Sequence, residues 1–245
     1  MVALNFFKRR RAVALQGFPG IGNVGKILID YLVKIYKPEK VKKLTTNHFP
    51  SIVFVKERNL LEPPQVLFYR KVLKDFDLIL LSGNIQPTED YSAYVVADLI
   101  SKELIKENVT ELIALGGIGL PIEPEKPKLF IAGTDSELVR KVKKKWKLND
   151  SFGIVNHISG LAGLVPLFCE KRAIPSIIII AETFANPFYL GLPGARATFQ
   201  FVKKYLNLEL PLSDFDKEFK IKVSRPKIER KTGHLSNVND LNYIG

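Results

Sequence analysis

The sequence predicts an α/β fold: a three-layer sandwich in which helices cover both faces of a mostly parallel central sheet. Short apolar or β-rich segments alternate along the chain with segments of helical apolar spacing. Strands this apolar are usually covered on both faces, as in parallel sheets. With 245 residues, 46% of them hydrophobic, the chain can bury one such core, and we expect a single domain over residues 1–219.

Seven segments carry the strand pattern, each bounded by turn residues. They cover residues 11–15, 51–55, 66–70, 77–82, 111–116, 128–132 and 176–182. Two of them meet around Glu62, Pro63 and Pro64, so residues 51–70 are expected to form a hairpin or an excursion. The strands in the middle of the sheet are expected to be parallel.

Five segments have helical spacing, and they fall between the predicted strands. They cover residues 23–36, 91–107, 135–146, 161–171 and 193–206. Turns rich in Gly, Ser, Asn and Gln follow several strands, at the edge where open α/β sheets place their clefts. A shared crevice is therefore expected there. From residue 220 the apolar periodicity ends, and residues 220–245 are expected to form a flexible or partner-ordered basic tail.

A glycine-rich turn within residues 15–32 joins the first predicted strand to the first predicted helix. Gly20, Gly22 and Gly25 give the G-x-G-x-x-G pattern of dinucleotide-binding turns, and Lys26 completes the G-x-x-x-x-G-K pattern of phosphate-binding loops. Glycine also permits positive φ and close backbone packing, so the same residues fit a structural role.

Both nucleotide patterns lack their next requirement. A phosphate-binding loop continues with Ser or Thr as a magnesium ligand, but Ile27 occupies that position. A dinucleotide site needs Asp or Glu about 20 residues further on, where this chain has Lys42, Lys43 and Thr45. We therefore expect no nucleotide cofactor. The start of the helix remains a candidate anion site, formed by Gly20, Gly22, Asn23, Gly25 and Lys26.

No catalytic residue and no metal site is predicted. The nucleophile elbow of hydrolases requires Gly two residues before the serine, and His157 occupies that place before Ser159. The histidines His48, His157 and His234 lack the spacing of a helical zinc site. Cys169 lies in an apolar segment, which favours a buried thiol.

The formal net charge of +12 fits a nucleic-acid or ribosomal partner, but a lysine-rich composition is also typical of heat-adapted proteins. The lysines around Trp146, within residues 141–147, favour a solvated helix face because consecutive lysines spread around a helix. No apolar stretch reaches the roughly 18 residues of a membrane span, so we expect an unexported cytoplasmic protein.

Five motifs, taken in their order along the chain, resemble the PAC2, or proteasome assembly chaperone, family of archaeal type. They are the glycine turn at 17–26, Ser-Gly-Asn-Ile-Gln-Pro at 82–87, Leu-Gly-Gly at 115–117, Ile-Ser-Gly-Leu-Ala-Gly-Leu at 158–164 and Ala-Glu-Thr at 181–183. The resemblance implies a phosphorylase/hydrolase-like α/β fold without established enzymatic activity. The family has historically been linked to the ATP-grasp superfamily. It also implies a homo-oligomer that engages proteasome α-subunits during core-particle assembly.

The end of the tail is a candidate partner-binding segment, with Leu241, Tyr243 and Ile244 as its contact residues. Related docking factors end in a hydrophobic residue, then Tyr, then a final residue, whereas Tyr243 is third from the end of this sequence. The tail could instead pack along its own domain or a neighbour. Two other functions stay open: a ligase-like or hydrolase-like enzyme using the crevice, and a ribosome- or RNA-associated basic protein.

Overall fold

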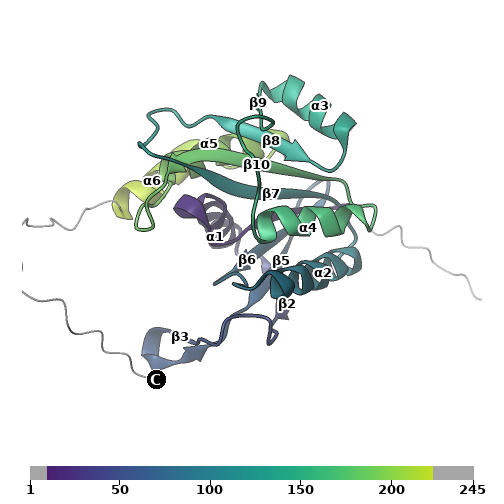
Figure 1. Ribbon diagram of the computed structural model, residues 1–245, viewed down its shortest axis with the longest axis vertical. Helices are drawn as coiled ribbons and strands as arrows, with labels where there is room; N and C mark the ends of the chain where they lie inside the picture. Colours follow the sequence, from purple (N-terminus) through teal and green to yellow (C-terminus); the bar gives the residue numbers. More distant parts are fainter. Residues whose placement is uncertain (1–9, 223–245) are drawn as a thin grey trace, which may run out of the picture.

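The computed structural model describes residues 10–222, with the side chains of residues 10–219, and its centre is an eight-stranded sheet (Figure 1). In spatial order the strands are β2 (Glu39–Leu44), β5 (Val66–Val72), β6 (Asp77–Gly83), β1 (Ala12–Gly17), β7 (Val109–Leu120), β10 (Ser176–Phe184), β8 (Leu129–Gly133) and β9 (Asn149–Asp150). The four middle strands β6, β1, β7 and β10 are parallel, as predicted. Antiparallel pairs join β5 to β6, β2 to β5 and β8 to β10.

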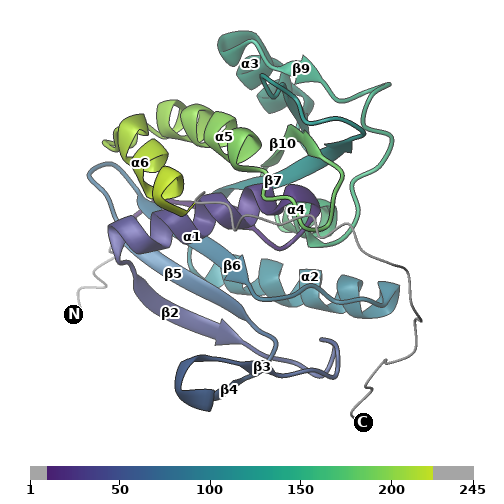
Figure 2. The ribbon, with the colours of Figure 1, turned by 90° about the vertical axis from the view of Figure 1, so that its left-hand side faces the viewer.

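Helices form a layer on each face of this sheet, which confirms the three-layer sandwich (Figures 1 and 2). One layer contains α1 (Val24–Tyr36), α5 (Leu192–Tyr205) and α6 (Leu212–Lys222), and the other contains α2 (Asp90–Lys106) and α4 (Leu161–Glu170). The helix α3 (Ser136–Trp146) lies at the β8 edge, where Trp146 contacts Phe201 and Tyr205 of α5 edge-on. Within residues 10–222, no helix combines the length and apolarity that crossing a membrane requires.

Side chains alternate along each strand, so successive residues pack into hydrophobic cores on opposite faces of the sheet. Val13 and Leu15 of β1 pack in the α1 and α5 layer, whereas Ala12 and Ala14 pack in the α2 and α4 layer. All of β6 is likewise buried. Burying one aliphatic side chain stabilises a fold by about 1.5–3 kcal/mol, so strands that are apolar on both faces require both helical layers.

The predicted excursion over residues 51–70 is present, but its pairing differs from the expectation. The strand β3 (Phe54–Val55) pairs with β4 (Leu61–Glu62) around the short η2 helix (Glu57–Asn59). Arg58 and Asn59 have positive φ and make the turn. The strand β5 joins the main sheet instead, because its alternate residues Val66 and Phe68 are fully buried there.

Two longer elements were not predicted from the sequence, in addition to the two-residue strands β4 and β9. The edge strand β2 is mostly exposed and rich in Lys and Glu, so it lacks an apolar pattern. The helix α6 continues to Lys222, past the expected start of the tail at residue 220, and buries Phe215 against Tyr31. The tail residues Leu241, Tyr243 and Ile244, and His234, lie outside the described residues.

Candidate functional site

The glycine-rich turn connects β1 to α1 through the short η1 helix (Ile21–Asn23), and its glycines meet steric requirements. Gly22 has φ of 62°, in the left-handed region. A Cβ atom on Gly17 would lie 2.2 Å from the carbonyl oxygen of Gly25, and one on Gly25 would lie 2.5 Å from that of Leu115. This geometry therefore favours a packing role for the glycines, which let α1 lie directly on β1 and β7.

The candidate anion residues do not surround one common space. The backbone N–H of Gly20 donates to the Asn23 side chain at 3.4 Å. The Lys26 ammonium forms an ion pair with Asp30 and lies 3.3 Å from the hydroxyl of Ser82, at the end of β6. Of the five candidates, Gly20 alone lines the cavity described below. Anion binding by Asn23 or Lys26 would have to displace these internal contacts.

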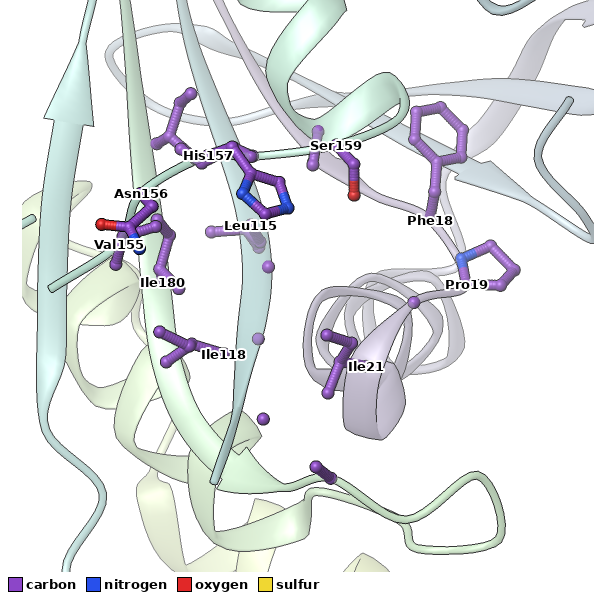
Figure 3. Close-up of a pocket in the computed structure, with 18 of the residues that line it drawn as sticks. Phe18, Pro19, Ile21, Leu115, Ile118, Val155, Asn156, His157, Ser159 and Ile180 are labelled. Carbon is purple, nitrogen blue, oxygen red and sulfur yellow. The ribbon is translucent and has the colours of Figure 1, made fainter. Parts of the chain in front are cut away.

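The crevice expected at the carboxyl ends of the strands is present as a cavity of about 450 Å³ (Figure 3). That volume lies within the usual range for ligand pockets. The lining comes from the β1 turn, β7, β10 and the loop before α4. Its residues are Phe18, Pro19, Gly20, Ile21, Gln86, Leu115, Gly116, Gly117, Ile118, Gly119, Ile154, Val155, Asn156, His157, Ile158, Ser159, Ala162, Ile178, Ile180 and Ala185.

Gln86 ties the loops around this cavity together. Its amide nitrogen donates to the Pro19 carbonyl, and its amide oxygen accepts from the backbone N–H of Leu161 at 2.8 Å. Gln16, buried in β1, donates to the carbonyl of Leu161 at 2.7 Å. The motif glutamine therefore has a structural task, since it holds the β1 turn against the start of α4. The sequence pattern predicts that Gln86 lies at the crevice, but it contains no signal for the hydrogen bonds to Pro19 and Leu161.

The polar residues at the cavity mouth are Asn156, His157 and Ser159, all exposed. Figure 3 shows the His157 ring and the Ser159 hydroxyl directed toward the cavity. No Asp, Glu, Lys or Arg is among the described residues that line it. A serine and a histidine without an acidic partner lack the third group that orients the base in hydrolase triads.

The other titratable residues singled out in the sequence lie elsewhere. The His48 ring is 3.4 Å from the Ser92 hydroxyl and contacts Tyr91 edge-on. Burial raises the pKa of the Cys169 thiol to about 12, so it stays protonated at neutral pH, and the predicted buried thiol is confirmed. Among residues 10–222, no three His, Cys, Asp or Glu side chains gather as a metal site would require.

The lysine-rich helix α3 makes local ion pairs on its outer face. Lys141 pairs with Glu137 at 2.8 Å, and Lys143 pairs with Asp150. The Lys145 ammonium lies 5.3 Å from the ring centre of Trp146, which packs inward. These contacts favour a solvated helix face over a nucleic-acid site.

Comparison with known proteins identifies the family. The model of the PAC2 family matches residues 14–221, which cover both helical layers and the cavity. The chain belongs to the PAC2 family. The resemblance seen in the five sequence motifs is thereby confirmed.

Proteins similar to this chain include archaeal proteins of similar length. The uncharacterized protein MJ1210 of Methanocaldococcus jannaschii is 32% identical over 246 residues, covering 96% of this chain and 92% of that protein. The crystal structure of Pyrococcus furiosus PbaB, an archaeal proteasome activator, matches with a TM-score of 0.78 and 26% identity, over 87% of this chain and 90% of PbaB. Pyrococcus furiosus PbaA, an archaeal homolog of proteasome-assembly chaperone, shares the fold with a TM-score of 0.71 and 20% identity, over 86% of this chain and 84% of PbaA.

Proposed function

We propose that this PAC2 protein is a non-enzymatic, oligomeric binding protein of the cytoplasm that engages proteasome α-subunits during core-particle assembly. The observation that carries the proposal is the similarity to the proteasome activator PbaB over nearly the whole of both chains. The absence of an acidic group among the described cavity residues supports a binding role rather than hydrolysis.

The β3–β4 hairpin supports the homo-oligomer part of the proposal. It projects from the β2 side of the body (Figure 2) and exposes five apolar side chains. These are Ile52, Val53, Val55, Leu60 and Leu61, exposed by between 43% and 69%. An isolated two-stranded hairpin is marginally stable in water, and contiguous exposed apolar surface marks an interaction site. A second copy packed against this hairpin would cover it.

The segment with Leu241, Tyr243 and Ile244 is the proposed contact with the α-subunits. Pull-down of the tagged protein from native cell extract at moderate salt tests this, since electrostatic binding to ribosomes weakens with salt. Proteasome α-subunits should be recovered with the full chain and reduced with a chain lacking residues 233–245. Leu241→Asp should also reduce the recovery of α-subunits. Its matched control is Asn242→Asp, which adds the same charge at the adjacent residue and should leave the recovery unchanged. Recovery of ribosomal proteins instead, or of α-subunits equally by every variant, would contradict the proposal.

A further inference from the structure

The strand β7 continues past its neighbour β1 beside the cavity. Pairing between β1 and β7 ends at Gly17 and Leu115, whereas pairing between β7 and β10 continues to Leu120 and Phe184. Within residues 10–222, no strand pairs with residues 116–120 of β7 on the β1 side. These residues are half-buried. Such an edge presents backbone N–H and C=O groups to which an extended peptide can add as a further strand.

The three glycines of this edge, Gly116, Gly117 and Gly119, differ in how much space a side chain would have there. A Cβ atom on Gly117 would lie 2.5 Å from the Ile21 carbonyl oxygen, and one on Gly119 would lie 2.7 Å from the Cβ of Ala185, so packing explains both. A Cβ atom on Gly116 would meet nothing within 4 Å, and its φ is not positive. Neither packing nor backbone conformation explains a glycine there. Its effect is to keep the cavity open above β7.

The open edge and the cavity therefore form one groove. Its floor is β7 at residues 116–119, and its walls are the β1 turn and the loop with His157 and Ser159 (Figure 3). Ile118 faces the same side of β7 as Gly116 and, like Val155, packs against the buried cluster that contains Ile178 and Ile180. A peptide strand along this edge would place every second side chain over Gly116 and Ile118, where space for a large apolar group exists.

We propose that this groove binds an extended, mostly uncharged segment, that its occupant is the chain's own C-terminal segment, residues 235–245, and that this segment leaves the groove when it engages the α-subunits of the proposed function. That segment has one charged side chain, Asp240, whereas the part before it is basic. The described lining of the groove contains no Asp, Glu, Lys or Arg, which suits a segment with little charge. Leu241 and Tyr243 are two positions apart, so in an extended strand they share a face, which matches the alternate positions above Gly116.

The length of the intervening chain permits this docking. Between Lys222 and Leu241 lie 18 residues, enough to span about 65 Å when extended. A domain of this size has a radius of gyration of about 17 Å, so the segment can reach any part of the surface. Tethering raises its effective concentration to about the millimolar range, so even a weak peptide would occupy the groove. Residues 1–9, by contrast, lead into the amino end of β1, the end opposite the groove.

Hydrogen–deuterium exchange of β7 tests the proposal without any proteasome component, so its result is independent of the proposed function. The amides of residues 116–120 should exchange about three- to tenfold more slowly in the full chain than in a chain ending at residue 234. A synthetic peptide of residues 235–245, added at millimolar concentration, should restore the slow exchange. Equal exchange in the two chains, or no response to the peptide, would overturn the proposal.

Two substitutions locate the contact. Leu241→Asp should abolish the difference between full and truncated chains, whereas Asn242→Asp, with the same charge on the opposite strand face, should retain it. Gly116→Leu should also abolish it by filling the groove, with each variant compared to its own truncation. Its melting temperature should not fall, because a Cβ atom at residue 116 meets no atom within 4 Å and the cavity leaves room for the rest of the side chain. A difference that survives in both Leu241→Asp and Gly116→Leu would refute the assigned groove, and Leu241→Asp decides alone if Gly116→Leu does not fold.

Discussion

Gly17→Ala should destabilise the protein more than its single added methyl group suggests. The new Cβ would lie 2.2 Å from the oxygen and 2.4 Å from the carbon of the Gly25 carbonyl, and 2.7 Å from a side-chain carbon of Ile29. Two of these atoms are backbone, so relief requires α1 to move away from β1. Overpacking a core usually costs about 1–3 kcal/mol, and a backbone clash belongs at the upper end, about 3 kcal/mol. Alanine recovers about 0.5–1 kcal/mol of strand propensity.

The net loss expected for Gly17→Ala is therefore about 2–2.5 kcal/mol of unfolding free energy. For a domain of this size that corresponds to a fall of roughly 4–10 °C in melting temperature. Denaturant unfolding measures the loss directly, as a lower midpoint at unchanged slope. Gly116→Ala is the matched control, because its Cβ meets nothing, and it should stay within about 0.5 kcal/mol of the parent. A Gly17→Ala protein as stable as this control would refute the reasoning.

Three further predictions concern binding, assembly and titration. Calorimetry with magnesium present should detect no binding of ATP, GTP or NAD(H), since Ile27 offers no magnesium ligand; micromolar affinity that disappears in Lys26→Ala would show a nucleotide site. Light scattering in dilute buffer should give an oligomeric mass that falls in Val55→Lys, because a lysine would desolvate poorly at the hairpin interface; a monomeric mass for the parent would contradict this. The raised pKa of Cys169 stabilises the fold below the ordinary thiol pKa of 9.0, and this contribution should fall as pH rises from 9 toward 12. Replacing Cys169 with Ala should remove that part of the pH dependence, and an unchanged alkaline profile would contradict the burial argument.

The central strands were predictable because continuous apolar sequences indicate that both faces of a strand are buried. The apolar stretches that form β6 and β10 are followed by turn residues, and each lies in the middle of the sheet. The edge strand β2 was not predictable in this way, since an exposed strand rich in Lys and Glu reads like a loop. The turn of the β3–β4 hairpin was misplaced because Pro63 and Pro64 are stronger turn signals than Arg58 and Asn59.

The glycine motif and the cavity show a second limit. The sequence correctly predicted tight packing at Gly22 and Gly25, since glycines between a strand and a helix have this use. The sequence alone does not distinguish Gly116 from Gly117. The two residues face opposite sides of β7, and the tertiary structure determines what packs against each side. The same holds for Gln86, whose partners are the distant residues Pro19 and Leu161.

Direct titration with purified proteasome α-subunits tests the central claim of α-subunit engagement. In sedimentation velocity at moderate salt, the full chain and the α-subunits should form a faster common boundary, and the chain lacking residues 233–245 should form less of it. The melting temperature of that truncated chain should remain within a few degrees of the parent, since the deleted segment has few apolar residues. Separate boundaries for the full chain and the α-subunits at micromolar concentrations would contradict the account.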